Sequence, residues 1–566
     1  MGGDATVQQL ADDVHDLAMA RSPLEASLVG DHRFDALVPD VTTAGRAAAR
    51  RAGAALRDRV DAVGQEALTT TDRVTVDVCR HVIDQLDHEL DDRYVRAAAG
   101  PMTSGAAIGS AASAVLSGMP KLVLAEPTHA DDLLTRCRRI PGWLAAAEAQ
   151  LRLGVRGGIV PPARLVAATV RQLDRYLATA PDADPLLVDG PPDLDTARWR
   201  ALLGGVLTST VRPALAAHRQ VLADEIAPAA RPDGRAGVCH LPDGGELYGT
   251  AVRIHTTTDA GPEHWHQLGH DLLAALDDEY RRLGPRVLGT GEPAEIFALL
   301  RGDPALRFAT SDQVFAAAAA ALARAQAAVG DWFTGVPAIP CEVREIPPIE
   351  APEATIAYYQ PPALDGARPG IYFVNTSEPC TRPRFEAEAL AFHESVPGHH
   401  TQIATAMELD LPTLRRVRYL TAHAEGWGLY AERLADEMGL YGDDLSRLGM
   451  LSYDSWRACR LVVDTGVHAF GWSRDRAVDF MRDHSPQAPG NVATEVDRYL
   501  GWPGQALAYM AGRTAILRLR DRASSALGDR FAIADFHAQV LGHAAVPLRT
   551  LEQLIDGWIA DVMAGR

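Results

Sequence analysis

Apolar side chains recur every three to four residues through most of this chain, which is the spacing of amphipathic helices. Alanine, leucine and arginine fill these stretches, and all three are strong helix formers. Proline and glycine separate them, as at Pro161-Pro162. The pattern predicts helices over residues 45–95, 130–155, 163–177 and 195–228.

Strand-like runs cluster in the middle of the chain. They are short and rich in β-branched or aromatic residues. Four such runs lie at 248–257 (YGTAVRIHTT), 341–346, 355–359 and 370–375 (GIYFVN). We expect them to form one small antiparallel sheet. From residue 384 onward the helical spacing returns almost to the end of the chain, so the pattern predicts a mainly α protein.

Composition excludes several classes of partner. The 566 residues are 47% hydrophobic and 23% charged, an ordinary globular balance. A net charge of −19 argues against nucleic acid or an anionic membrane as a main partner. Six scattered cysteines without a Cys-x-x-Cys pair favour free thiols in a reducing compartment. The first residues are acidic where a signal peptide is basic, and no apolar tract reaches the length of a membrane span, so we predict a soluble cytoplasmic protein.

The segment 393–400 reads HESVPGHH, and it indicates the chemistry of the protein more specifically than any other segment of the chain. It begins like H-E-x-x-H, in which two histidines on one helix face bind zinc and the glutamate acts on the bound water. Here Pro397 stands where the second histidine is expected. Proline has no N–H, and its ring clashes with the carbonyl of His393, so the helix predicted over 384–393 must kink or bulge just past Glu394. Gly398 allows this at little cost, and the segment indicates a variant metal site.

Two histidines compete for the place of the second ligand. In an unbroken helix His400 lies on the same face as His393 but about 10 Å further along the axis. That is awkward for two imidazoles that each approach zinc to about 2.0–2.1 Å. A two-residue loop-out brings His399 into the place instead. We therefore predict His393 and His399 as ligands and keep His400 as the substitute. The alternative is that these histidines only favour the negative end of a helix.

A third ligand is expected from a later helix, predicted over residues 415–438. Glu425 lies there within Ala-Glu-Gly-Trp-Gly-Leu-Tyr, and the small Gly426 and Gly428 allow another helix to approach closely. Two histidines and a glutamate leave the fourth zinc position for water, as in catalytic sites. The alternative is an exposed glutamate in an i,i+4 pair. We predict one zinc ion at this site.

The next predicted helix carries an ionic stripe. Arg457, Arg460, Asp464 and His468 follow one another by three, four and four residues on an otherwise apolar helix. Burying charged side chains on an apolar helix costs free energy unless they form ion pairs or bind a ligand. The stripe is therefore either a buried Arg460–Asp464 ion pair with His468 as a neighbour, or a surface that contacts the backbone or carboxylate of a substrate.

Two tyrosines and a second histidine-rich segment complete the candidates. Tyr499 and Tyr509 lie in RYLGWPGQALAY. A tyrosine hydroxyl near the metal can stabilise an oxyanion, although a core tyrosine with a satisfied hydroxyl is the commoner case. His264, His266 and His270 are spaced i, i+2 and i+6, so they do not share one helix face. We interpret them as the start of a helix beside the sheet.

Four motifs in fixed order resemble those of a known family: HESVPGHHTQ, AEGWGLYAERLADEMGLY, RACRLVVDTGVHAFGWS and RYLGWPGQALAY. With GIYFVNT upstream and FHAQVLGHAAVPLRTLE downstream, nearly the whole chain resembles the bacterial family named domain of unknown function 885. That family is similar in fold to the thermostable zinc carboxypeptidases, and more distantly to the angiotensin-converting-enzyme-like peptidases. The resemblance implies a large, two-lobed, zincin-like helical protein with a deep central cleft.

The resemblance also implies roles for individual residues. His393 and His399 match the two histidine ligands, Glu394 the general base and Glu425 the distant glutamate ligand. Tyr499 matches the transition-state tyrosine of the related peptidases. We expect an N-terminal helical lobe over residues 1–240 and a catalytic lobe with the sheet and the metal helices over residues 241–566, joined in one structural unit.

The sequence thus predicts a zinc-dependent peptidase, carboxypeptidase- or oligopeptidase-like, that hydrolyses short peptides. Glu394 moves the proton of the attacking water. The expected oxyanion contacts are Tyr499 and His468, and the expected substrate contacts are Arg457, Arg460 and Tyr509. Two alternatives stay open: a hydrolase of a non-peptide amide or ester, and a member of the fold that lost its metal through Pro397.

Overall fold

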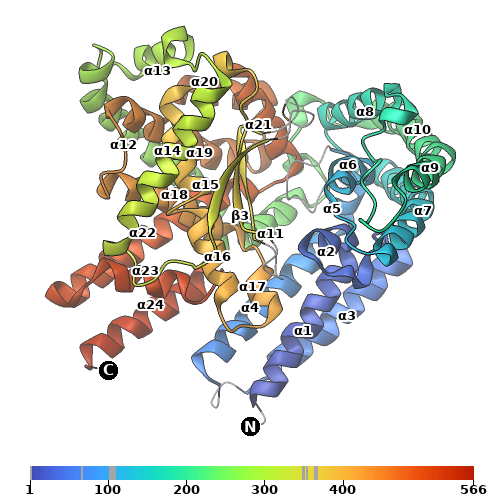
Figure 1. The fold of residues 1–566 in the computed structure, drawn as a ribbon, viewed down its shortest axis with the longest axis horizontal. Coiled ribbons are helices and arrows are strands. Elements are labelled where there is room, and N and C mark those ends of the chain that lie inside the picture. The colour runs from blue at the N-terminus through green and yellow to red at the C-terminus, as the bar shows by residue number, and fades with distance from the viewer. Residues whose placement is uncertain are drawn as a thin grey trace.

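The computed structural model describes residues 3–64, 68–100, 110–346, 351, 355–362 and 368–565. Helices dominate these residues, which confirms the mainly α fold class (Figure 1). The N-terminal helices are α1 (Gly3–Arg21), α2 (Pro23–Val29), α3 (Thr43–Asp61), α4 (Thr70–Glu89), α5 (Asp92–Ala97), α6 (Ala111–Gly118), α7 (Pro127–Gly157), α8 (Ala163–Ala178), α9 (Thr196–Val206) and α10 (Arg212–Val221). The later helices are α11 (Gly244–Thr256), α12 (Pro262–Val287), α13 (Pro293–Gly302), α14 (Ser311–Ala328), α15 (Ala387–Glu394), α16 (His399–Glu408), α17 (Thr413–Val417), α18 (Thr421–Glu437), α19 (Asp444–His468), α20 (Arg474–His484), α21 (Pro489–Gly501), α22 (Ala508–Leu527), α23 (Ile533–Leu541) and α24 (Leu548–Met563).

The predicted N-terminal stretches are helical, as expected. Residues 45–95 divide among α3, α4 and α5, and a reciprocal capping box between Thr69 and Asp72 starts α4. Residues 195–228 contain α9 and α10, which a π-helical turn at Leu207–Val211 joins. The segment with His264, His266 and His270 forms the first turns of α12, so it does start a helix.

Three strands form a small mixed sheet in the order β1-β3-β2, with bounds β1 (Cys341–Glu345), β2 (Ala357–Gln360) and β3 (Gly370–Val374). β2 pairs with β3 antiparallel, but β1 runs parallel to β3, with Cys341 opposite Gly370. The expectation of a purely antiparallel sheet is therefore wrong. β1 and β3 are not consecutive strands, and the long chain between them permits the crossover that parallel neighbours need.

The fourth run predicted as a strand, residues 248–257, is helical instead: residues 248–256 lie within α11, and Thr257 is the residue that follows it. Its buried Tyr248, Val252 and His255 follow one another by four and three residues, so they form one helix face. The helical period of the buried positions outweighs the β-branched composition on which the strand prediction relied.

Buried hydrophobic side chains form two cores. The smaller one contains residues between 99 and 226. The larger one combines residues 7–94 and Leu165 with residues 236–559. The division at residue 240 stays a prediction about domains, but the first helices share their core with the C-terminal half. In Figure 1 the helices α6 to α10 lie on the right and most later helices on the left.

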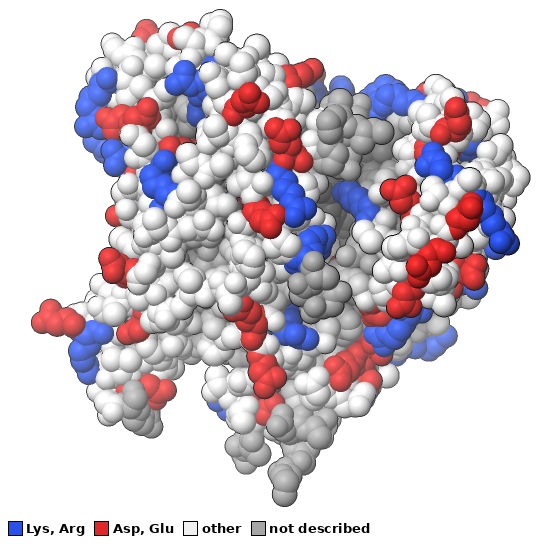
Figure 2. Space-filling model, viewed as in Figure 1, with Lys and Arg blue, Asp and Glu red and all other residues white. Residues whose placement is uncertain are grey.

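A cavity lies where the two parts of the chain meet. Its lining includes Tyr94, Gly100 and Leu165 from the N-terminal part, and Leu247, Arg498 and Trp502 from the C-terminal part. Figure 2 shows that one face of the molecule is hollowed between the helices α8 to α10 and the larger body, with acidic and basic side chains interspersed. A deep zincin-like cleft stays a prediction. Within the described residues, no helix combines the length and apolar character needed to cross a bilayer.

Glycines bring the helices around the histidine motif close together. A Cβ on Gly426 of α18 would lie 2.4 Å from the Cα of Gly512 in α22. A Cβ on Gly449 of α19 would lie 1.7 Å from the carbonyl oxygen of Phe385, just before α15. Only glycine permits backbones to approach this closely. The close approach predicted for Gly426 is confirmed, and it brings α18 directly against α22.

Candidate metal centre

The motif helix breaks at the predicted position. α15 ends at Glu394 and α16 begins at His399. In the connection, Ser395 donates to the carbonyl of Ala391 from its backbone N–H (2.8 Å) and from its hydroxyl (2.5 Å). A Cβ on Gly398 would lie 2.0 Å from the carbonyl oxygen of His393. The chain therefore folds back on the end of α15, and glycine is the residue that allows it.

Trp427 holds the folded-back connection from the side of α18. Its indole N–H donates to the carbonyls of Pro397 (2.9 Å) and Gly398 (3.2 Å). The indole is fully buried, and its partners are the two residues that cannot belong to a regular helix at this point. The tryptophan thus gives the carbonyl of Pro397 a hydrogen-bond partner, and it shares the carbonyl of Gly398 with the backbone N–H of Gln402 (3.2 Å).

The break brings three predicted ligands together. The Nε2 atoms of His393 and His399 lie 3.4 Å and 3.5 Å from Oε2 of Glu425. One donor atom from each of the three residues lies within 4.8 Å of the others. Two ligands bound to zinc at about 2.0–2.1 Å and separated by a tetrahedral angle lie about 3.3–3.4 Å apart. The donor set and its spacing therefore fit a zinc ion.

The electrostatics of the cluster suit a cation. Burial disfavours the charged form of His393, but its contacts with Glu425 and Glu432 outweigh burial and raise the pKa of His393 to about 9. Burial also disfavours the Glu425 carboxylate, yet the two histidines hold its pKa well below the usual range. An ionised carboxylate thus faces an imidazole that carries a proton, and a divalent cation would displace that proton.

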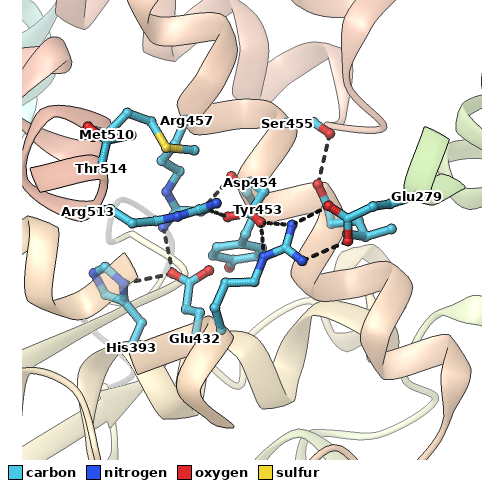
Figure 3. A network of polar contacts seen from close by, with 12 residues as sticks. Glu279, His393, Glu432, Tyr453, Asp454, Ser455, Arg457, Met510, Arg513 and Thr514 are labelled. Carbon is cyan, nitrogen blue, oxygen red and sulfur yellow. Dashed lines mark hydrogen bonds and ion pairs between the residues drawn. The ribbon is translucent and has the colours of Figure 1, made fainter. Parts of the chain in front are cut away.

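Glu432 is a site residue that the sequence analysis missed (Figure 3). Its Oε1 lies 2.8 Å from Nδ1 of His393, and Nη2 of Arg457 lies 3.7 Å from the same oxygen. A carboxylate on the outer nitrogen fixes the ring and directs Nε2 toward the other ligands, as in many metal sites. Glu432 follows Glu425 by seven residues, so the helical period places both on one face, and this spacing was the available signal.

Gly428 makes room for the ring of His393. A Cβ at this position would lie 2.6 Å from Cε1 and 2.9 Å from Nδ1 of the imidazole. The side chain of His393 therefore packs directly on the backbone of α18, between Glu425 and Glu432. The glycine was noted in the sequence as a place of close helix approach, and the approaching group is this imidazole.

Tyr419 is a second site residue that was missed. It lies between α17 and α18, and its hydroxyl donates to Oε1 of Glu425 at 2.8 Å. Its ring centroid lies 6.2 Å from that of His399, while 42% of the residue remains exposed. Desolvation of the hydroxyl and the charge of Glu425 raise the pKa of Tyr419 well above its usual range. Tyr419 lies where the structure interrupts the helix predicted over residues 415–438, and helical periodicity does not mark a residue in such a connection.

Glu394, the predicted general base, is the last residue of α15 and is half-buried. Burial raises the pKa of the hydroxyl of Tyr372 in β3, and the charge of Glu394 adds to that effect. The charge of Glu394 also contributes to the raised pKa of Tyr419. The carboxylate is therefore within electrostatic range of both the sheet and the rim of the metal cluster.

His400, the substitute ligand, is not brought to the cluster. Its Nε2 lies 3.1 Å from the carbonyl oxygen of Ile339, and its Nδ1 lies 2.9 Å from the hydroxyl of Tyr359. A carbonyl only accepts, so Nε2 carries the hydrogen and Nδ1 accepts from the tyrosine. Burial lowers the pKa of His400 to about 4. Both nitrogens are committed to the sheet side of the helix, which corrects the expectation that His400 could replace His399.

The ionic stripe of α19 does not face the cluster as a unit. His468 is fully buried; it accepts from the backbone N–H of Val238 at 3.2 Å and donates to the carbonyl of Tyr499 at 3.0 Å. Both nitrogens are used, so the expectation that His468 stabilises an oxyanion is corrected. Arg457 lies behind Glu432, with its guanidinium 4.2 Å from the ring centroid of Tyr453, so its charge faces the carboxylate that contacts His393. A substrate contact at Arg457 stays a prediction.

The alternative of an Arg460–Asp464 ion pair is also corrected. Arg460 donates to Glu495 at 3.0 Å, whereas Asp464 accepts from the hydroxyl of Tyr248 at 2.6 Å and from the backbone N–H of Gly504 at 2.9 Å. Burial, only partly offset by these hydrogen bonds, raises the pKa of Asp464 to about 7. The two members of the stripe thus belong to separate networks.

Tyr499 and Tyr509 are placed differently from each other. The hydroxyl of Tyr499 is buried; it accepts from Arg460 (3.0 Å) and Trp456 (3.2 Å) and donates to Glu495 (2.8 Å). These three partners satisfy it, so the expected transition-state role for Tyr499 is corrected. Tyr509 is within electrostatic range of the cluster: burial raises the pKa of its hydroxyl, and the charge of Glu425 adds to that effect.

One other group among the described residues has metal-ligand composition. Its members are His32, Asp35 and His129. The rings of His32 and His129 stack with centroids 3.8 Å apart and planes 15° apart. The ring nitrogens of two stacked, nearly parallel imidazoles point along parallel planes. The ligand atoms of one metal ion must instead point toward a common centre. The cluster of His393, His399 and Glu425, with rings 79° apart, has the convergent arrangement.

Comparisons with known proteins agree with this fold. A family model described as "Bacterial protein of unknown function (DUF885)" matches residues 23–555. The crystal structure of a "putative lipoprotein" from Colwellia psychrerythraea is similar, with a TM-score of 0.90 and 22% identity, covering 99% of this chain and 100% of that one. A "putative lipoprotein of unknown function" from Shewanella oneidensis has a TM-score of 0.75 and 18% identity, covering 97% and 99%. At these identities the likeness establishes the shared fold. No curated protein matches the chain.

Proposed function

Since the chain belongs to the bacterial family DUF885, whose description leaves its activity open, we propose that it is a zinc-dependent hydrolase that cleaves short peptides. The observation that carries the proposal is the convergence of His393, His399 and Glu425. Two imidazoles and one carboxylate form an open zinc site of the catalytic type, with one position left for water. The half-buried Glu394 beside His393 supplies the group that such a site needs as a base.

The roles of the chain's own residues follow from their positions. A bound zinc ion supplies Lewis-acid chemistry: it polarises a carbonyl and lowers the pKa of a water. Glu394 takes a proton from the attacking water and gives it to the leaving amine, so no free hydroxide or amide anion has to form. Glu432 and Arg457 hold His393 in place from behind. Trp427 fixes the connection that orients His399.

A substrate carboxylate has a proposed contact at Arg460 and Tyr509. The guanidiniums of Arg460 and Arg498 share the single carboxylate of Glu495, so this buried group has excess positive charge. Nη1 of Arg460 is buried and has no hydrogen-bond partner among the described residues. The guanidinium lies 4.3 Å from the ring centroid of Tyr509, a tyrosine whose pKa is raised by burial and further by the charge of Glu425. This arrangement supports a carboxypeptidase-like preference for peptides with a free C-terminus.

The test combines metal analysis with a peptide library. Protein purified without a histidine tag is expected to bind one zinc ion per chain and to cleave short peptides, with products identified by mass spectrometry. Glu394→Gln keeps the metal and loses activity by about 10²–10⁴-fold, the usual contribution of a general base. Equal, negligible cleavage by wild type and Glu394→Gln would remove the peptidase assignment.

The same experiment separates the alternatives. Each peptide is offered with a free and with an amidated C-terminus, and cleavage of the free form is expected to be favoured about 10–100-fold, as for a hydrogen bond to a charged group. Bound zinc with no peptide cleavage directs the search to non-peptide amides and esters. No zinc on titration means a non-catalytic member of the fold. Cytoplasmic location stays a prediction, and the words "putative lipoprotein" describe the two similar structures alone.

A further inference from the structure

Glu425 presents its two oxygens to different partners. Oε2 faces Nε2 of both His393 and His399, at 3.4 Å and 3.5 Å. Oε1 instead accepts the hydroxyl hydrogen of Tyr419 at 2.8 Å. A carboxylate can bind a metal through one oxygen or through both. In this structure the second oxygen is already occupied by a hydrogen bond of ordinary length.

We propose that Tyr419 is a positioning residue that restricts Glu425 to coordination through Oε2 alone. The proposal rests on the proposed metal site and adds a function for a residue outside the ligand set. An open coordination position is what distinguishes a catalytic zinc site from a closed structural one. By holding Oε1, the tyrosine keeps this oxygen from taking the position that water and substrate need.

The placement of Tyr419 suits this function. The residue lies in the connection between α17 and α18 and is 42% exposed, so its ring contributes little to either core. Its hydroxyl nevertheless points inward to Glu425, and its ring lies edge-on to His399, with planes 64° apart. A ring that packs on one ligand and bonds to another limits the movement of both.

The other hydroxyls nearby are already used. Tyr499 donates to Glu495, and Tyr359 bonds to His400. Tyr430, on the same helix as Glu425, lies 2.8 Å from Nε2 of His537. Among these tyrosines, only Tyr419 contacts one of the three residues that converge in the cluster, His393, His399 and Glu425. Tyr430 therefore offers a matched control, since Tyr430→Phe removes one hydroxyl from α18 without touching the ligand set.

The test uses the full chain loaded with cobalt(II), whose visible absorption reports coordination number, and with zinc for X-ray absorption. Tyr419→Phe is expected to bind one metal per chain with affinity reduced by about tenfold, the lower range for a lost outer-shell partner. Its cobalt spectrum weakens and shifts as the site gains a fifth ligand from Oε1, and the zinc edge shows one more oxygen neighbour. Tyr430→Phe keeps the wild-type spectrum.

The outcomes separate the two proposals. A wild-type protein that binds no metal overturns both. A wild type that binds metal, with an unchanged spectrum and coordination number in Tyr419→Phe, overturns the positioning function and leaves the metal centre standing. A spectral change in Tyr430→Phe equal to that in Tyr419→Phe also overturns it, because the effect would then be general. Since Tyr419 is half-exposed, loss of its hydroxyl leaves the cores intact, and circular dichroism checks this directly.

Discussion

Single residues around the metal cluster have functions that their chemistry defines once their neighbours are known. Nδ1 of His393 contacts Glu432, and Nε2 faces Glu425. One nitrogen thus orients the ring, and the other is directed toward the candidate metal position. His468 and His400 have the same chemistry, but backbone and side-chain partners occupy both of their nitrogens. The difference between a ligand and a structural histidine is therefore a matter of partners.

At the residue scale, the carboxylate of Glu432 is expected to determine metal affinity. Glu432→Gln replaces the charged acceptor of His393 Nδ1 by a neutral amide, so the ring is less well oriented and less basic. Zinc affinity, measured by competition with a chromophoric chelator, should fall about 10–100-fold. Glu437→Gln is the control: Glu437 is an exposed residue of the same helix and pairs with Arg520, so this variant should bind zinc normally. Equal affinities in both variants would contradict the support assigned to Glu432.

Tyr499 gives a prediction of a different kind at the same scale. Tyr499→Phe leaves Nε of Arg460 and the carboxylate of Glu495 each without one buried partner. The free energy of unfolding should fall by about 1–3 kcal/mol, the cost of an unsatisfied buried group. Zinc affinity should not change, because Tyr499 contacts no ligand. Denaturant unfolding and zinc titration measure the two effects separately. If Tyr499→Phe lowered zinc affinity as far as Glu432→Gln does, Tyr499 would have to be counted among the residues that support the metal site.

At the scale of elements, the decisive feature is the contact between α15 and α18. The imidazole of His393 lies against Gly428, so any side chain there must displace it. Gly428→Ala should abolish measurable zinc binding, or lower affinity at least as far as Glu432→Gln, although alanine is the better helix former. The control is Gly557→Ala in α24, where a Cβ meets nothing within 4 Å, and it should be neutral or stabilise by about 0.5–1 kcal/mol. Normal zinc binding by Gly428→Ala would contradict this packing.

Elements also show how far periodicity alone can predict. The prediction that the helix breaks just past Glu394 follows from the chemistry of Pro397, and α15 does end at Glu394. The run at 248–257 has strand-like composition but helical burial, and burial is a tertiary property. The parallel pairing of β1 with β3 was also missed, because pairing depends on how a long connection crosses the sheet. Local rules therefore predict where an element stops better than what it packs against.

At the scale of the whole molecule, buried neutral histidines make stability depend on pH. Burial is the main cause that lowers the pKa values of His88 and His537 to about 4 and those of His255 and His468 to about 3. The unfolded value is about 6.5, so between these limits the unfolded chain binds more protons than the folded one. Stability is then complete above about pH 6.5 and falls on acidification, by up to about 1.4 kcal/mol per pH unit for each histidine.

The expected result is a melting temperature clearly lower at pH 5 than at pH 7.5, measured by calorimetry in the presence of a chelator so that metal release does not contribute. Asp464 has the opposite sign: burial raises its pKa to about 7, so its protonation favours the folded state on acidification. His393, whose pKa is raised to about 9, acts in the same direction as Asp464, whereas the lowered pKa values of His400 and His423, about 4, act with those of the four histidines. A melting temperature at pH 5 equal to or above that at pH 7.5 would show that these histidines are not neutral in the folded protein.

The sequence by itself determined the elements and the chemical inventory. Helical periodicity, the histidine motif, the break at Pro397 and Glu425 between two glycines are all local properties of the chain. Tertiary structure alone decided which groups meet. It placed His399 rather than His400 toward the cluster, Glu432 behind His393 and Tyr419 on Glu425, and it directed Tyr499 and His468 elsewhere. The physical reason is that ligand convergence and hydrogen-bond partnership depend on distances between segments far apart in the chain, which periodicity does not encode.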